Sequence, residues 1–263
     1  MNRTLVFGFF IFFSCAMTSS ASAFDQTHEA LGRILARIVT PQGVDYKTLK
    51  SKRAALDGYL KSIGSVTPED LQAFSPNQRL AFWINAYNAR VLQSVIDAYP
   101  VASVQEIPGM FKEKTFEVAG TQMTLDQLEN EIIRKRFKEA RVHFALNCAA
   151  KSCPPLQGHP FVGATLDKDL EAAARRFLSL PTGIQFDREK RMLKISKIFE
   201  WFGSDFIEHY MPAHKDPKRS DAENAVLGFI ATRAPSPIAA VLREREAFTL
   251  GYLEYDWALN EAR

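Results

Sequence analysis

The chain contains few cysteines, glycines and prolines, and its charges nearly cancel. Of its 263 residues, 3 are Cys, 13 are Gly and 13 are Pro, while 46% are apolar. These proportions exclude collagen-like, low-complexity and disordered architectures, and the length is sufficient for a full hydrophobic core. The net charge is only +3, from 33 basic and 30 acidic residues. Because a nucleic-acid binder needs a concentrated basic surface, this balance argues against nucleic acid as a partner.

Long apolar runs are also absent, except near the first residue of the chain. Residues 5–13 are apolar apart from one glycine, Arg3 precedes them, and Ala21-Ser22-Ala23 follows with small side chains. This order of a positive charge, an apolar stretch and a small-residue cleavage site predicts a signal peptide over residues 1–23, with cleavage after Ala23. The run is shorter than the roughly 20 residues that cross a bilayer. We therefore expect a periplasmic or secreted protein with no membrane span after cleavage.

The remaining residues, 24–263, contain no internal repeat and no Ser/Gly-rich linker, so we expect one globular domain. Apolar periodicity and turn residues predict helices over residues 77–99, 125–137, 166–178, 202–210 and 221–232. The predicted strands are residues 115–118, 122–124, 141–148, 184–187, 192–198 and 253–257. Helices and strands follow one another irregularly. This order favours an α+β fold, mostly helical, around a small and mainly antiparallel sheet.

The segment from residue 141 to 156 carries most of the residues that could perform chemistry. Read as a strand, residues 141–148 place His143 and Asn147 on one face and Cys148 on the other, core-like face. Cys153 follows the strand, where a turn of the chain would bring it back towards His143. An imidazole lowers the pKa of a nearby thiol and carries its proton, so this arrangement predicts Cys153 as nucleophile and His143 as base. Cys148 is the alternative nucleophile if the strand ends early.

Other interpretations of the cysteines stay open. Cys15 lies in the predicted leader, in a poor context for lipid attachment, so the mature chain keeps Cys148 and Cys153. An even pair in an oxidising compartment is typical of a short-loop disulfide. His143, His159 and the two cysteines are also zinc-ligand types, but their spacing differs from common zinc motifs. We predict no metal and no cofactor.

Glu129 is a candidate because of its place on the predicted helix 125–137. A rotation of ~100° per residue puts Glu129 inside the apolar stripe of this helix. A carboxylate on an apolar face is costly unless it is paired. Glu129 therefore either forms a salt bridge, for example with Arg136, or orients the histidine of a Cys/His/Glu site. Asn147 is the other candidate for that orienting role.

Three further polar residues are substrate-binding or structural candidates. Asn85 and Asn88 share a small-residue face of the longest predicted helix, and buried amides require partners. Lys197 shares a strand face with Ile195 and Phe199 and needs an acidic partner. The simplest interpretation of these residues is that they tie neighbouring segments together.

Several motifs along the chain resemble the family called domain of unknown function 547. They are Phe82-Trp-Ile-Asn-Ala-Tyr-Asn-Ala89, Thr124-Leu-Asp-Gln-Leu-Glu129, Val142-His-Phe-Ala-Leu-Asn-Cys148, Ser152-Cys-Pro-Pro-Leu156, Ser196-Lys-Ile-Phe-Glu-Trp-Phe202 and Tyr255-Asp-Trp-Ala-Leu-Asn260. The resemblance covers nearly all of residues 24–263 and implies one domain, but it implies no activity. The residue types are also similar, at a distance, to those of papain-like and transglutaminase-like thiol hydrolases. In those proteins Cys precedes His, so this likeness implies a permuted arrangement here.

Two functional hypotheses follow. The first is a thiol-dependent hydrolase or acyl transferase that acts on an amide or ester through a Cys/His/Glu-type site. The second is a non-catalytic binding or scaffold module in which Cys148 and Cys153 form a structural disulfide. The partner is accordingly a substrate or another periplasmic protein, and the sequence names neither.

Overall fold

The computed structural model describes residues 24–244 and 247–262. The predicted signal peptide, residues 1–23, lies outside the described residues. None of the described helices is both long and apolar enough to cross a membrane. Helices dominate the structure, and the strands form two hairpins and one three-stranded sheet, so the α+β prediction is confirmed. The single small sheet that we expected is instead divided into three.

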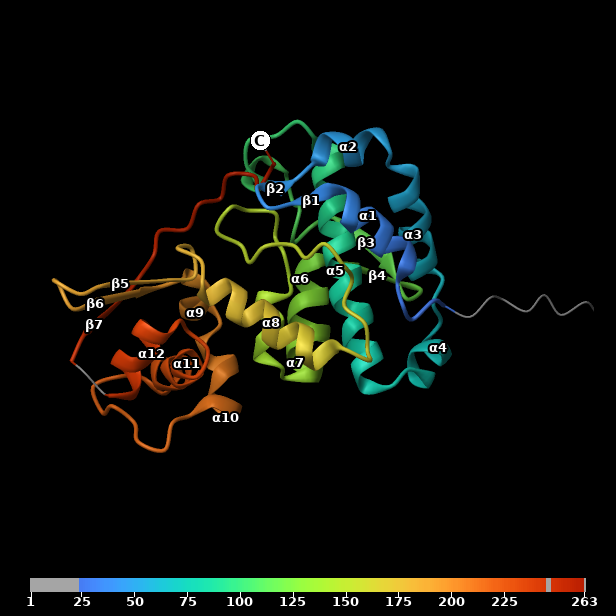
Figure 1. Ribbon diagram of the computed structural model, residues 1–263. Coiled ribbons are helices and arrows are strands. Elements are labelled where there is room, and N and C mark those ends of the chain that lie inside the picture. The colour runs from blue at the N-terminus through green and yellow to red at the C-terminus, as the bar shows by residue number, and fades with distance from the viewer. Residues whose placement is uncertain (1–23, 245–246, 263) are drawn as a thin grey trace, which may run out of the picture.

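The first part of the chain packs around one long helix, α5 (Figure 1). Its elements are α1 (Glu29–Ile38), β1 (Val39–Thr40), β2 (Gly43–Val44), α2 (Tyr46–Ser51), α3 (Ala54–Gly64), α4 (Pro68–Ala73), α5 (Pro76–Ala98), η1 (Val104–Glu106), β3 (Thr115–Val118) and β4 (Thr121–Thr124). Ser75 caps α5 through the backbone N–H of Gln78, and Pro76 occupies its first turn. Nearly every residue of α5 from Leu80 to Ile96 is buried. This helix is therefore the centre of the larger hydrophobic core.

A short chain of helical turns connects this core to the second one. Its elements are α6 (Leu125–Gln127), the π-helix η2 (Leu128–Arg134), α7 (Lys135–Phe137) and the 3₁₀ helix η3 (Ala140–Phe144). Thr124 and Gln127 form the capping box that the sequence predicts for the start of this run. The predicted helix over residues 125–137 is thus confirmed, with a π-helical middle.

The second part of the chain forms a smaller core, which lies at the left of Figure 1. Its elements are α8 (Leu166–Leu178), β5 (Ile184–Asp187), β6 (Met192–Ile195), α9 (Lys197–Trp201), the 3₁₀ helix η4 (Gly203–Phe206), α10 (Ile207–Tyr210), α11 (Asp221–Ala231), α12 (Ser236–Arg243) and β7 (Thr249–Tyr252). Strand β6 pairs antiparallel with β5 and parallel with β7. Aromatic side chains fill this core, and Phe144 from η3 stacks against Phe229 of α11.

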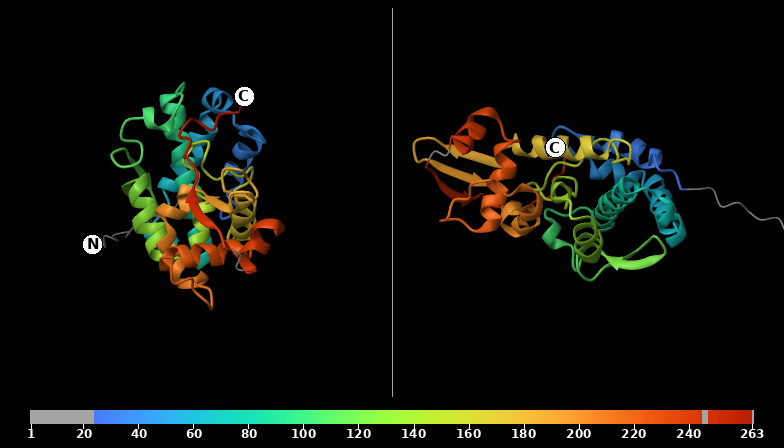
Figure 2. Two further views of the ribbon diagram at one scale, coloured as in Figure 1. Left: turned by 90° about the vertical axis from the view of Figure 1, so that its left-hand side faces the viewer. Right: turned by 90° about the horizontal axis from the view of Figure 1, so that it is seen from below.

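The last residues of the chain link the two cores. We predicted a strand over residues 253–257, but β7 ends at Tyr252 and residues 253–262 run from the three-stranded sheet to the first core (Figures 1 and 2). Isolated bridges pair Ala258 with Ser103, Leu259 with Ala150, and Glu261 with Val44. Tyr255, within this segment, packs against both cores. Because these partners are distant in the sequence, their pairing leaves no recognisable pattern among the residues of this segment.

The predicted strand over residues 141–148 is wrong. Residues 140–144 form η3, and Glu139 begins this 3₁₀ helix by accepting a hydrogen bond from the backbone N–H of Arg141. Residues from Val142 to Asn147 are all buried, so burial does not alternate as it does in a half-exposed strand. A short apolar run of this kind has the same pattern in a buried strand and in a buried helical turn.

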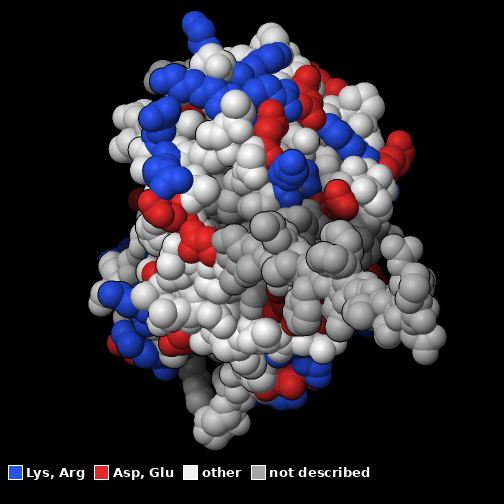
Figure 3. Space-filling view, turned by 90° about the vertical axis from the view of Figure 1, so that its right-hand side faces the viewer, with Lys and Arg blue, Asp and Glu red and all other residues white. Residues whose placement is uncertain are grey.

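Basic residues gather along the upper part of the face drawn in Figure 3, where acidic residues interrupt them. In the structure as a whole, ion pairs at α1 and α3 join Arg33 to Glu29, and Arg53 to both Asp57 and Asp97. All of these side chains are at least partly exposed to solvent. Their ion pairs are surface interactions that contribute little to stability.

Candidate functional site

The centre of the candidate site is His143, a buried imidazole between the two cores. Its side chain is only 2% exposed, and its Nε2 atom lies 2.8 Å from Oδ2 of Asp205 in η4. The ring stacks on Phe202 with a centroid separation of 4.2 Å. An ionised carboxylate only accepts hydrogen bonds, so this network assigns the proton to Nε2. In the neutral ring, Nδ1 is therefore the atom that accepts a proton.

Arg134, the last residue of the π-helix η2, holds Asp205 in place. Its guanidinium donates two hydrogen bonds to this carboxylate, at 2.7 and 2.9 Å. Burial alone would raise the pKa of Asp205, but the hydrogen bonds from His143 and Arg134 outweigh it and hold that pKa well below its ordinary value. Asp205 is thus a permanently charged group that orients His143. Sequence reasoning did not single out Asp205 or Arg134, because nothing local distinguishes them from surface charges.

Glu129 lies in the same π-helix and faces the same centre. Its Oε2 atom accepts a hydrogen bond of 3.1 Å from the hydroxyl of Tyr87 on α5. No salt bridge joins it to Arg136 in the described part of the chain. Burial raises the pKa of Glu129, and the nearby charges of His143 and Arg134 offset only part of this effect. Carboxyl groups with pKa values shifted in opposite directions, as in Glu129 and Asp205, are typical of acid–base sites. π-helical segments are also frequent at functional sites.

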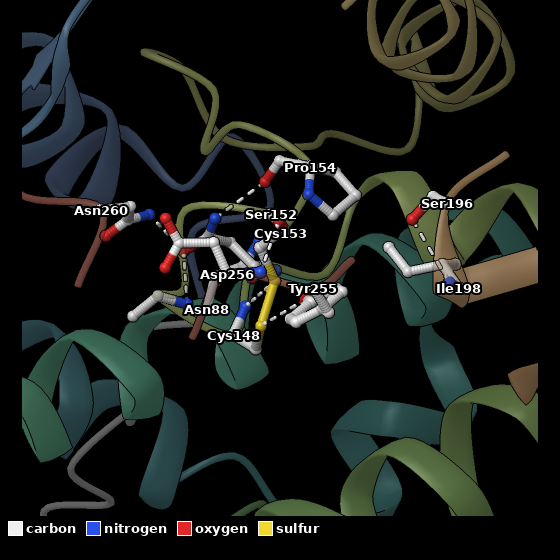
Figure 4. Close-up of a disulfide and its surroundings, with 12 residues drawn as sticks. Asn88, Cys148, Ser152, Cys153, Pro154, Ser196, Ile198, Tyr255, Asp256 and Asn260 are labelled. Atoms are coloured by element: carbon white, nitrogen blue, oxygen red, sulfur yellow. Dashed lines mark hydrogen bonds between the residues drawn. A yellow bond between two sulfur atoms is a disulfide. The ribbon is translucent and has the colours of Figure 1, made fainter. Parts of the chain in front are cut away.

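The two cysteines form a disulfide, which Figure 4 shows with its surroundings. The Cα atoms of Cys148 and Cys153 are 6.1 Å apart, within the range of such bonds. Cys153 is 6% exposed, and its sulfur accepts a hydrogen bond from the backbone N–H of Cys148. Cys148 is more exposed, and its sulfur lies 3.3 Å from the Tyr255 hydroxyl. Among the described residues, neither sulfur is hydrogen-bonded to His143, so Cys153 turns back to Cys148 instead of the imidazole.

Tyr255 connects the disulfide to the carboxylate of Glu129. Burial raises the pKa of Tyr255 above its ordinary value of 10.0, and the charge of Glu129 raises it further. Tyr87 shows the same two effects, to which its hydrogen bond to Glu129 adds. Both tyrosines are therefore protonated hydroxyl donors at neutral pH. They lie within the quoted sequence motifs, but the motifs do not indicate that both side chains interact with Glu129.

The three asparagines are engaged by the backbone. The side chain of Asn85 donates to the carbonyl of Phe161 and accepts from the N–H of the same residue. The side chain of Asn88 donates to the carbonyl of Ala145 and accepts from the N–H of Asn147. The side chain of Asn147 donates to the carbonyl of Pro154 and accepts from the N–H of Ala149. The amides of Asn85 and Asn88 therefore tie the loops of residues 145–161 to the helix α5, and the amide of Asn147 ties these loops to one another. The structure places Asn147 away from the orienting role, which Asp205 occupies.

Lys197 lies outside this centre. Strand β6 ends at Ile195, two residues before Lys197, so the predicted strand face shared with Phe199 does not exist. The Lys197 ammonium forms a salt bridge of 2.6 Å with Glu200 and lies over the ring of Tyr252. The acidic partner that the sequence required is thus a neighbour on the same helical turn.

The alternative metal site is not formed. Within residues 24–244 and 247–262, no group of three or more His, Cys, Asp or Glu side chains is arranged to hold a metal ion. His159 is exposed, and its Nδ1 atom lies near the carbonyl of Pro160. A cavity of about 850 Å³ beside α11 and another of about 430 Å³ among α1, α2 and α3 contain no residue of the His143 centre. The His143 centre is therefore a cluster of side chains that lines neither cavity.

Comparison with known protein families gives a match over part of the chain. Residues 71–178 match the model of the family described as "Protein of unknown function, DUF547". This segment belongs to that family. It contains Tyr87, Glu129, His143 and both cysteines, whereas Asp205 and Tyr255 follow it in the chain. No curated protein and no solved structure matches the sequence.

Proposed function

We propose that the protein is a thiol-dependent hydrolase or acyl transferase that acts on an amide or ester bond. His143 is the general base and Cys148, in its reduced form, is the nucleophile. The observation that supports this proposal is the carboxylate-bound imidazole, because Asp205 engages Nε2 and leaves Nδ1 as the proton acceptor. A nucleophile, a base and a group that orients the base are the three components of such a site.

Cys148 replaces Cys153 as the favoured nucleophile because of exposure and contacts. Cys153 is buried beneath the backbone of Cys148. The sulfur of Cys148 is the one that meets the Tyr255 hydroxyl, which is also in electrostatic range of Glu129. A hydroxyl donor beside the nucleophile is suited to bind the oxyanion that forms on a substrate carbonyl. Cys153 is then the partner that protects the thiol.

The reaction begins with reduction of the disulfide. An external dithiol transfers two electrons and two protons to the sulfurs and is itself oxidised to a disulfide. His143 takes the proton of the Cys148 thiol, and the thiolate forms a bond to the carbonyl carbon of the substrate. The bond to the amine or alcohol breaks, and that leaving group takes the proton from His143. Water in a hydrolase, or an acceptor amine or hydroxyl in a transferase, then releases the acyl group and regenerates the thiol.

A panel of p-nitrophenyl esters and p-nitroanilides, assayed with and without dithiothreitol, tests this proposal. The wild-type protein should be active only after reduction, whereas Cys153→Ser should be active without it because its Cys148 is free. Cys148→Ser and His143→Gln should lose at least about 100-fold in kcat/KM. His159→Gln, a change of an exposed histidine outside the centre, is the matched control. Activity that ignores reductant and survives Cys148→Ser would overturn the proposal.

The disulfide supports a second candidate, a non-catalytic binding module. In that case the Cys148–Cys153 bond and the asparagine ties only hold the loops of residues 145–161 in place. Alkylation followed by mass spectrometry separates the two candidates. A Cys148 thiol that is labelled well below pH 8 after reduction supports the enzyme, since a base that takes the thiol proton, as proposed for His143, lowers the pKa of the thiol. Reduced thiols with ordinary reactivity, together with no turnover of the panel, support the binding module.

The predicted signal peptide supports a periplasmic or secreted location for this activity. The partner is then a substrate or a protein of the same compartment. Fractionation of cells that express the full chain, followed by N-terminal sequencing, tests the location. A mature protein that begins at Phe24 in the periplasm or medium agrees with cleavage after Ala23, and an uncleaved cytoplasmic protein contradicts it.

A further inference from the structure

Three aromatic side chains pack together beside the disulfide, and one of them, Trp201, is exposed. Trp201 of α9 packs against Tyr255 and Trp257, with centroid separations of 4.9 and 5.8 Å, and Tyr255 packs against Trp257 at 4.5 Å. Trp201 is 44% exposed, although it is one of the largest apolar side chains of the chain. The two indoles are within 25° of parallel. We call Trp201, Tyr255 and Trp257 the aromatic platform.

The geometry of the platform restricts what it binds. Its rings contact one another, so no space remains between them for the ammonium group that an aromatic cage encloses. The exposed indole of Trp201 instead offers a flat apolar surface. Two exposed carboxylates lie next to it in sequence, Glu200 before Trp201 and Asp256 between Tyr255 and Trp257. The carboxylate of Glu200 is bound to Lys197, so Asp256, whose two chain neighbours both belong to the platform, is the acidic residue that distinguishes this surface. A flat apolar surface with a hydrogen-bond-accepting carboxylate in the same segment suits a ring that has an apolar face and hydroxyl groups.

We infer that the aromatic platform holds a pyranose ring, so that the substrate is an O-acylated or N-acylated carbohydrate. Tyr255 connects the aromatic platform to the proposed nucleophile, because its ring belongs to the platform and its hydroxyl contacts the sulfur of Cys148. A sugar ring stacked on Trp201 would thus present an acyl group one aromatic ring away from the nucleophile. This inference names the substrate class of the proposed function and rests on it.

Calorimetric titration of the full-length Cys148→Ser variant, which cannot turn over its ligand, tests the inference. The probe is the β-1,4-linked tetramer of N-acetylglucosamine, which carries both pyranose rings and amide bonds. Adding Trp201→Ala should weaken binding at least tenfold, and Trp201→Phe should restore most of it. Ile207→Ala removes the other exposed large apolar side chain of the described residues and should leave binding unchanged.

Two results would overturn the platform as a sugar site. One is equal affinity of the tetramer for the Cys148→Ser protein with and without the added Trp201→Ala change, at matched thermal stability. The other is binding of an acetylated tetrapeptide but not of the tetramer. Hydrolysis of small p-nitrophenyl esters keeps the two proposals apart. Esterase activity without sugar binding refutes the platform alone, whereas Trp201-dependent sugar binding without esterase activity refutes the thiol mechanism alone.

Discussion

The carboxylate of Asp205 should stabilise the fold as well as orient His143, and Asp205→Asn measures that contribution. The side chains of Asp205 and Arg134 are 24% and 23% exposed, and two hydrogen bonds join them. Asparagine has the same shape but carries no charge and accepts through only one oxygen. Arg134 then keeps a partly buried charge without its counter-ion.

The expected cost follows from this partial burial. Removing one partner of a fully buried pair costs about 3–5 kcal/mol, because the remaining charge is unpaired. A quarter of each side chain is exposed here, so solvent screens part of the loss, and we expect a decrease of about 2–3 kcal/mol in the free energy of unfolding. Glu208→Gln is the matched control. Glu208 is 57% exposed in its salt bridge to Lys138, and its loss should cost less than about 0.5 kcal/mol.

Urea denaturation followed by circular dichroism, under oxidising conditions, provides the measurement. The pH dependence supplies a second check. The pKa of Asp205 in the folded protein lies below the ordinary 3.8, so its stabilising effect is present above that pH and is lost as the pH falls further. The difference between wild type and Asp205→Asn should therefore shrink below about pH 4. Equal stabilities of Asp205→Asn and Glu208→Gln at pH 7 would refute the reasoning.

Three further predictions concern other parts of the structure. Asn88→Ala leaves two buried backbone groups without their partner, and chemical denaturation should show a loss of about 2–4 kcal/mol. Burial lowers the pKa of His28 from 6.5 to about 4, so the unfolded chain binds more protons between these values and stability falls as the pH is lowered through them. His28→Gln should remove up to about 3 kcal/mol of that dependence, seen as urea midpoints compared at pH 7 and pH 4. Replacing both Cys148 and Cys153 by Ser removes a cross-link between residues 5 apart in the chain. Thermal melting should show a decrease of about 2 kcal/mol in the free energy of unfolding, because the unfolded chain gains entropy. An unchanged melting temperature would contradict this expectation.

Helix boundaries were predictable where capping and periodicity agree. The sequence predicts helices over residues 77–99 and 166–178, and the structure has α5 at Pro76–Ala98 and α8 at Leu166–Leu178. The hairpin of β3 and β4 and the pairing of β5 with β6 were also predictable, since short alternating runs flank turn residues, whereas the two-residue strands β1 and β2 were not predicted. The predictions of strands over residues 141–148 and 253–257 were wrong, because neither segment forms a strand. Residues 142–147 are buried on all sides, so their burial does not alternate, and residues 253–257 form hydrogen bonds with distant segments, as Asp256 does with Ser152.

The residues of the candidate site also divide into those that the sequence indicated and those that it did not. His143, Glu129 and the two cysteines were identified because their chemistry is visible in single residues and short spacings. Asp205 was missed, although it lies 2.8 Å from His143, because 62 residues separate the two in the chain. Lys197 was selected from a strand face that the tertiary structure does not contain.

The sequence by itself determined the residue types, the main helices and hairpins, and the close spacing of Cys148 and Cys153, since each depends on neighbours along the chain. Only the tertiary structure decided which carboxylate orients His143, which sulfur faces Tyr255, and that Trp201 meets Trp257. These contacts join η3 to η4, and α9 to residues 253–262, across the boundary between the two cores. Local propensity contains no information about such pairs, because their partners are brought together only when the two cores pack.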